Sequence, residues 1–172
     1  PTAGQRELAG AITRRRADRR RYPAGPIPPA TLEMLYLRAA RFGVELAVVP
    51  RSRWVRHADG HVALLFPEAA ETPDDDAVLL VLGTREDTDD MRLRAGEALS
   101  HITLTATALG LASCPLTEPL NDMRSRLALA CEVFDGEAYP QTLIRLGLPP
   151  DGDESQPPTE RRPATETTTW TS

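Results

Sequence analysis

The residues best suited to bind a ligand form a run of arginines near the amino terminus. Positions 14–21 read RRRADRRR, so that six of eight residues are arginine. The planar guanidinium group makes paired, charge-assisted hydrogen bonds to phosphate, which makes this run a candidate phosphate site. A solvated helix end is the other interpretation, because the helix dipole favours cations there. The run by itself is compatible with both.

Two further segments carry candidate ligand-binding groups. The stretch GLASCPLT, from Gly110 to Thr117, follows a long apolar pattern and is typical of a helix end that leads into a strand. Arg161 and Arg162 stand in a polar carboxy-terminal tail, where they serve either solubility or the binding of an anion. Cys114 has no histidine at a recognisable spacing, so we predict that it is a small core residue, and we predict the same of Cys131.

Composition limits the classes of protein to which the chain can belong. It has 172 residues, 41% of them apolar, which is enough for one buried core. The net charge of -5 and the lack of aromatic residues within the arginine run argue against a nucleic-acid binder. Two cysteines indicate a reducing cytoplasm, and no apolar run is long enough for a membrane span or a signal peptide. The three histidines show no metal-ligand spacing, and we predict no metal site.

Hydrophobic patterns predict the elements that must position these residues. Apolar residues at spacings of three and four predict helices over residues 29–43, 91–110 and 120–131. Continuous apolar runs predict buried strands over residues 44–49 and 77–84, the second at the centre of the sheet, and a last strand covers residues 142–149. The pair Asp59-Gly60 predicts a β-hairpin.

The order of these elements predicts an α+β fold with α/β-like layers. We expect a mixed, mainly antiparallel sheet that packs against a long central helix and flanking helices. The long helix is predicted to be the most buried one, with Leu93, Leu99, Ile102 and Leu104 on more than one face. Such a helix has more apolar surface than a small sheet covers, so a homodimer is expected.

The segment ALSHITLTATALGLASCPLT, followed by a helix, YPQTLIRLGLPP and ERRP, resembles the second half of nitroreductase-like flavoproteins. The most similar group is the carboxy-terminal lobe of the actinobacterial, dormancy-associated Acg-type NAD(P)H nitroreductases. The resemblance covers roughly residues 8–49 and 77–166. It implies a nitroreductase-like lobe over residues 1–150 and a polar, proline-rich tail over residues 151–172.

The resemblance also implies the residues of a flavin mononucleotide (FMN) site. It assigns Arg15, Arg16 and Arg19 to the flavin phosphate or ring, although Ala17 stands where the family pattern has serine or threonine. It places Pro115, Leu116 and Thr117 beside the flavin ring, and Arg161 and Arg162 at the phosphate. No catalytic residue is assigned.

Two classes of function follow from the resemblance. The first is an FMN-dependent oxidoreductase that takes electrons from NAD(P)H and passes them to nitro or quinone-type acceptors. The second is a flavin-binding or flavin-sequestering protein, or the structural half of a two-lobe flavoprotein, without turnover. Acg-type chains have a preceding lobe whose signatures are absent from this sequence. The chain is therefore expected to be a truncated homologue, a fragment, or a single lobe that dimerises.

Overall fold

The computed structural model describes residues 1–65, 76–150, 160 and 162–169. Its centre is a four-stranded antiparallel sheet in the order β1-β4-β6-β5, beside a separate two-stranded hairpin of β2 and β3. The strands are β1 (Glu45–Val48), β2 (Trp54–Arg56), β3 (Val62–Leu64), β4 (Val78–Thr84), β5 (Ala112–Leu116) and β6 (Tyr139–Gly147). The helices are α1 (Ala3–Ile12), α2 (Pro29–Ala40), α3 (Asp89–Ala108), α4 (Met123–Phe134) and α5 (Ala164–Thr167), with short 3₁₀ turns η1 (Arg51–Arg53) and η2 (Glu118–Leu120).

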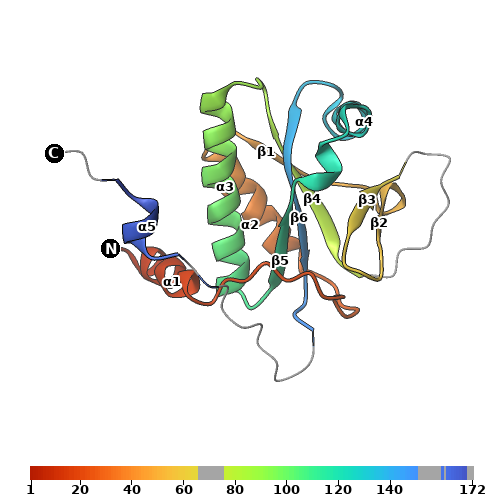
Figure 1. The fold of residues 1–172 in the computed structure, drawn as a ribbon. Helices are drawn as coiled ribbons and strands as arrows, with labels where there is room; N and C mark the ends of the chain where they lie inside the picture. Colours follow the sequence, from red (N-terminus) through yellow and green to blue (C-terminus); the bar gives the residue numbers. More distant parts are fainter. Residues whose placement is uncertain (66–75, 151–159, 161, 170–172) are drawn as a thin grey trace.

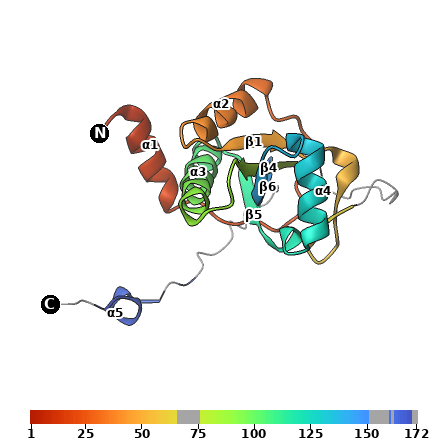
Figure 2. The same ribbon diagram turned by 90° about the horizontal axis from the view of Figure 1, so that it is seen from above.

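The sheet separates two hydrophobic cores. Figure 2 shows from above that α2 and α3 lie on one face of the sheet and α4 lies on the other. Alternate residues of β4 point to opposite faces, as the period of two of a strand requires. Leu80 and Leu82 pack towards α2 and α3, while Leu79 and Val81 pack towards α4 and the hairpin. Because helices cover both faces, the strand is apolar throughout. The predicted α+β fold, the central position of this strand and the hairpin are confirmed.

Helix α3 is held at both ends by local sequence signals. The Thr88 hydroxyl caps its amino terminus, and Asp89 and Asp90 in the first turn complement the helix dipole. Gly110, with φ of 76°, follows the carboxy-terminal end, as a glycine in the left-handed conformation commonly does. The predicted end of the helix at Gly110 is thereby confirmed, and β5 starts two residues later.

The structure corrects several predictions of burial. Leu93 on α3 is 65% exposed, and the buried side of this helix is formed mainly by alanine and threonine around Ile102. On α4, Met123 and Leu127 are exposed, because Leu129 and Phe134 on another side of the helix enter the core. The spacing of apolar residues in the sequence predicts instead that Leu120, Met123, Leu127 and Ala130 share the buried face of this helix.

Two further corrections concern β1 and a cysteine. Strand β1 was expected to be buried, but it forms an edge of the sheet and its terminal residues are exposed. An edge strand has a neighbour on one side only, so its apolar sequence does not guarantee burial. Cys131 was expected in the core and is exposed, whereas Cys114 is buried as predicted. Burial raises the pKa of the Cys114 thiol, which keeps it protonated.

Candidate flavin site

The arginine segment runs along the edge strand β5. The segment follows α1, and the N–H groups of Arg14 and Arg15 donate hydrogen bonds to the carbonyl of Ala11 at the end of that helix. Ala17 then pairs with Ser113 in a parallel β-bridge, and the N–H of Asp18 donates to the carbonyl of Ser113 over 3.0 Å. A segment near the amino terminus is therefore fixed beside the strand that follows the central helix.

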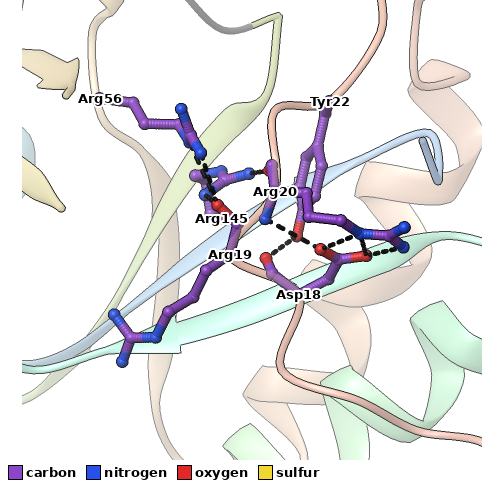
Figure 3. A network of polar contacts seen from close by, with 6 residues as sticks. All are labelled: Asp18, Arg19, Arg20, Tyr22, Arg56 and Arg145. Atoms are coloured by element: carbon purple, nitrogen blue, oxygen red, sulfur yellow. Dashed lines mark hydrogen bonds and ion pairs between the residues drawn. The ribbon is translucent and has the colours of Figure 1, made fainter. Parts of the chain in front are cut away.

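Two arginines from other parts of the chain hold this segment by its backbone (Figure 3). Arg145 of β6 is fully buried, donates to the carbonyls of Arg19 and Arg20, and lies 4.0 Å over the ring of Tyr22. Arg56 of the hairpin donates to the carbonyl of Arg19 over 2.7 Å. The Tyr22 hydroxyl donates to the carbonyl of Asp18 over 2.8 Å. Three consecutive backbone carbonyls, those of residues 18–20, are thus anchored by side chains.

Arg19 joins the arginine segment to the residues after β5. Its Nη2 lies 3.3 Å from Oε1 of Glu118, and the other carboxylate oxygen, Oε2, accepts a hydrogen bond from the N–H of Thr117. The N–H of Glu118 itself, then the N–H of Thr117 and the Arg19 guanidinium, lower the pKa of Glu118 below its ordinary value. The carboxylate is therefore ionised at neutral pH, and its charge offsets that of Arg19.

The structure brings together part of the predicted site. Arg19 lies beside Thr117, which is exposed at the end of β5, while Leu116 is buried and Pro115 is half-buried. Arg15 and Arg16 are half-buried residues of the same segment.

Of the two predicted carboxy-terminal arginines the structure describes Arg162, and no contact among the described residues joins it to this group. Arg161 lies outside the described residues. Arg162 is exposed, and Figure 2 shows α5, which begins two residues later, well away from the sheet.

A cavity of about 480 Å³ opens beside the arginine segment. Its walls come from the segment itself, the carboxy-terminal end of α3 and the start of β5. Arg20 is paired there with Asp18, since its Nη2 lies 2.7 Å from Oδ2 of the carboxylate. Burial alone would raise the pKa of Asp18, but hydrogen bonds from Arg20 and the charges of Arg20 and Arg145 lower it. The residues that line the cavity include Arg14, Arg16, Asp18, Arg20, Thr107 and Ser113.

Sequence reasoning missed several residues of this site. Arg14, Arg20 and Ser113 line the cavity but received no role, although all three belong to segments that were singled out. Arg145 and Arg56 were not considered at all. The available signal was a single arginine within the apolar run TLIRLGLP, since a charged residue seldom occurs in a buried strand.

No group of three or more histidine, cysteine, aspartate or glutamate residues is placed to hold a metal ion within the described ranges. No helix in the same ranges is both long and apolar enough to cross a membrane.

The layered sheet and the order of its elements define a nitroreductase fold. Among solved structures, one of a nitroreductase from Desulfovibrio desulfuricans in complex with FMN superposes with a TM-score of 0.66 at 19% identity, over 94% of each chain. A nitroreductase with bound FMN from Bacteroides fragilis gives 0.64 at 18% identity, over 96% of this chain and 99% of that one. At such identities the similarity establishes the fold alone.

The sequence relatives are proteins of Mycobacterium tuberculosis. The chain is 36% identical to "Putative NAD(P)H nitroreductase Rv3131" over 212 aligned residues, which cover 95% of this chain and 62% of the relative. It is 38% identical to "Putative NAD(P)H nitroreductase acg" over 107 residues. No protein-family model matches the chain. The resemblance to nitroreductase-like proteins, including Acg, is confirmed, and the chain spans less than two thirds of the first relative.

Proposed function

We propose that the chain is an FMN-binding, nitroreductase-like protein that acts as an NAD(P)H-dependent oxidoreductase on nitro or quinone-type acceptors. The observation that carries this proposal is the position of the arginine segment along β5, with Arg19 beside Thr117. Cationic side chains suited to a phosphate and a strand edge suited to a flat ring therefore share one side of the sheet. The names of the sequence relatives and the FMN-bound structures of the same fold support the proposal.

The residues of the chain fit this cofactor. Strand β5 lies at an edge of the four-stranded sheet, so residues beyond the bridge at Ser113 have a strand partner on one side only. We assign Pro115, Leu116 and Thr117 to the polar edge of the flavin ring, and Arg15, Arg16 and Arg19 to its anionic groups. Arg161 and Arg162 are assigned to the phosphate from the tail. FMN supplies the capacity for hydride transfer when bound, and the chain binds and orients it.

A second candidate function is flavin binding without turnover. The chain spans 62% of the relative named as a nitroreductase, so the activity of that whole protein does not carry over to it directly. In that case the chain sequesters flavin or forms one structural lobe of a two-lobe flavoprotein. We assign no catalytic side chain in either case.

The visible spectrum of the purified chain distinguishes these functions. A yellow protein whose flavin bleaches when a nicotinamide donor is added under anaerobic conditions supports the oxidoreductase. Bound flavin that stays oxidised with both NADH and NADPH supports sequestration. A colourless chain that takes up no FMN on reconstitution would contradict both flavin functions and leave a structural lobe.

The remaining expectations are part of the same proposal. We expect a cytoplasmic, dormancy- or stress-associated protein with a lobe over residues 1–150 and a tail over residues 151–172. It is expected to form a homodimer or to pair with a missing lobe, and to bind neither nucleic acid nor membrane. Exposed Leu93 is available for such an interface, whereas Ile102 is fully buried within the lobe. Sedimentation as a monomer across micromolar concentrations would count against the homodimer.

A further inference from the structure

A groove of about 320 Å³ lies between α4 and the start of β6, on the face of the sheet opposite α2 and α3 (Figure 2). Met123 and Leu127, one turn apart on α4, line it, and Tyr139 lines it from β6. These three side chains are 71%, 63% and 50% exposed, so large apolar groups in contact with solvent meet around one hollow. A cluster of exposed apolar side chains is typical of a surface that another molecule covers.

The groove is hollow because small residues complete its lining. Ala130 and Ala138 are buried there, and Gly136, with φ of 79°, belongs to the turn from α4 into β6. A Cβ atom at Gly136 would meet nothing within 4 Å, so this side of the groove is open. The hollow therefore has room for a large apolar side chain from outside. Met123 suits its wall, because the flexible, polarisable thioether of methionine adapts to different shapes.

The two charged residues that line the groove balance each other. Nη2 of Arg126 lies 3.3 Å from Oδ1 of Asp87, and its Nε donates to the carbonyl of Pro140 over 2.9 Å. Hydrogen bonds from Arg92, Gln141 and Arg126 lower the pKa of Asp87 to about 2, so this carboxylate is ionised at neutral pH. The lining of the groove therefore has no net charge, and an anion gains nothing by binding there.

The rim of the groove is acidic. Asp135 and Glu137 belong to the turn after α4, and Glu86 belongs to the loop before α3. All three are exposed, and none has an ion-pair partner within the described ranges. Asp122 and Arg124, on either side of Met123, carry opposite charges and offset each other. Unpaired carboxylates beside an apolar hollow favour a ligand with both apolar and cationic groups and disfavour an acidic one.

We propose that this groove is a docking site for a basic amphipathic segment of another protein. The segment inserts an apolar side chain between α4 and Tyr139 and places lysine or arginine against the acidic rim. A helix with apolar residues at i and i+3 or i+4, flanked by basic residues, has this pattern. A second copy of this chain fits less well, because a two-fold contact through the groove would bring two acidic rims together.

The docking site is separate from the proposed flavin site. None of the residues that line the groove lines the cavity beside the arginine segment or belongs to that segment. The inference therefore does not depend on the proposed flavin function. A variant of the groove should leave FMN affinity unchanged, which distinguishes a failure of one proposal from a failure of the other.

The test measures binding of a dye-labelled, synthetic amphipathic helix of leucine and lysine to the full chain by fluorescence anisotropy. Leu127→Gln removes an apolar wall, and Glu137→Lys reverses a charge of the rim. Each should weaken binding roughly tenfold, equal to about 1.4 kcal/mol. The effect of Glu137→Lys should shrink as added salt screens the charges. Leu37→Gln and Glu33→Lys are matched controls on α2, where Leu37 is 65% exposed and Glu33 is exposed, and both should bind the peptide like the wild type.

Several outcomes would overturn the proposal. These are no binding of the peptide, equal binding of a peptide with glutamate in place of lysine, or equal losses in the α2 controls. A wild-type dimer that becomes monomeric in Leu127→Gln during sedimentation would assign the groove to a second copy instead. Because Leu127 is largely exposed, Leu127→Gln should keep the circular dichroism of the wild type. If it unfolds, Met123→Gln at the same wall provides the same test.

Discussion

Replacing Arg145 by methionine tests whether this buried arginine holds the ligand-binding segment in place. Its guanidinium is the donor to two backbone carbonyls, those of Arg19 and Arg20, and it covers the ring of Tyr22 at 4.0 Å. Methionine has a similar length and no charge, so it fills the space but makes none of these interactions. The carbonyl of Arg19 still has Arg56 as a donor. The loss of hydrogen bonds to the backbone is therefore greatest at Arg20, whose side chain lines the cavity.

The expected loss of stability follows from opposing contributions. Hydrogen bonds from a charged donor are worth about 1.5–3 kcal/mol each, and a desolvated cation over an aromatic ring adds about 1–2 kcal/mol. Against this, a buried charge costs several kcal/mol of desolvation, which methionine does not incur. We expect a net loss of about 2 kcal/mol in the free energy of unfolding. For a chain of this size, that corresponds to a decrease in Tm of roughly 4–8 °C.

Urea unfolding followed by the fluorescence of buried Trp54 measures the stability, and titration with FMN and riboflavin measures the site. The Arg145→Met protein should lose more affinity for FMN than for riboflavin, because the displaced segment carries the phosphate-binding arginines. Arg145→Lys keeps the positive charge but lacks the planar guanidinium group. Its stability and its affinity for FMN should therefore lie between those of the wild type and those of Arg145→Met. Arg94→Met, at an exposed ion pair on α3, is the control and should change stability by less than about 1 kcal/mol. If Arg145→Met has the stability of the wild type and an unchanged ratio of FMN affinity to riboflavin affinity, the positioning role of Arg145 is falsified.

Three further predictions concern other positions. Arg162→Ala should weaken FMN binding roughly tenfold or more and leave riboflavin almost unaffected, whereas equal losses would assign the tail arginine to solvent. Hydrogen bonds from Arg92, Gln141 and Arg126 lower the pKa of Asp87 from 3.8 to about 2, so its stabilising effect is complete above about pH 4 and lost towards pH 2. Asp87→Asn should therefore cost at most about 2 kcal/mol at neutral pH and nothing near pH 2 in acid unfolding experiments. A Cβ at Gly147 would lie 2.6 Å from the Tyr22 ring, so Gly147→Ala should lower stability by about 1–3 kcal/mol, while Gly10→Ala, in open space, should not.

The fold was predictable where short-range patterns decide structure. The uninterrupted apolar run of β4 identified the central strand, because only a strand covered on both faces is apolar at every position. Asp59-Gly60 identified the hairpin, and Gly60 has the positive φ of 88° that such turns require. Periodicity identified α4 but not the side of it that is buried, since the helix has apolar residues on more than one side. Contacts with the sheet decide which side of α4 is buried, and these contacts involve residues that are distant in the sequence.

The site was predictable only as two separate segments. The arginine run and the stretch from Gly110 to Thr117 were recognised by residue type and order, but their pairing through Ala17 and Ser113 joins positions almost a hundred residues apart. The anchoring of the segment by Arg145 spans 125 positions and uses backbone carbonyls, which have no sequence signature. An arginine that binds carbonyls leaves no complementary acidic residue in the sequence by which it could be found.

The use of carbonyl groups as partners has an electrostatic consequence for the site. A carboxylate that fixed Arg145 would cancel its charge, whereas the backbone carbonyls of Arg19 and Arg20 accept hydrogen bonds from its Nη1 and Nη2 and carry no net charge. The segment and its two anchors bring eight arginines into one region. Asp18 pairs there with Arg20, as Figure 3 shows, and Glu118 pairs with Arg19. Repulsion among these charges disfavours the ligand-free fold, and an anion in the cavity relieves it. Binding of a phosphate-bearing ligand and stability of the lobe are therefore linked, because the energy that the repulsion costs is recovered when the anion binds to the folded state.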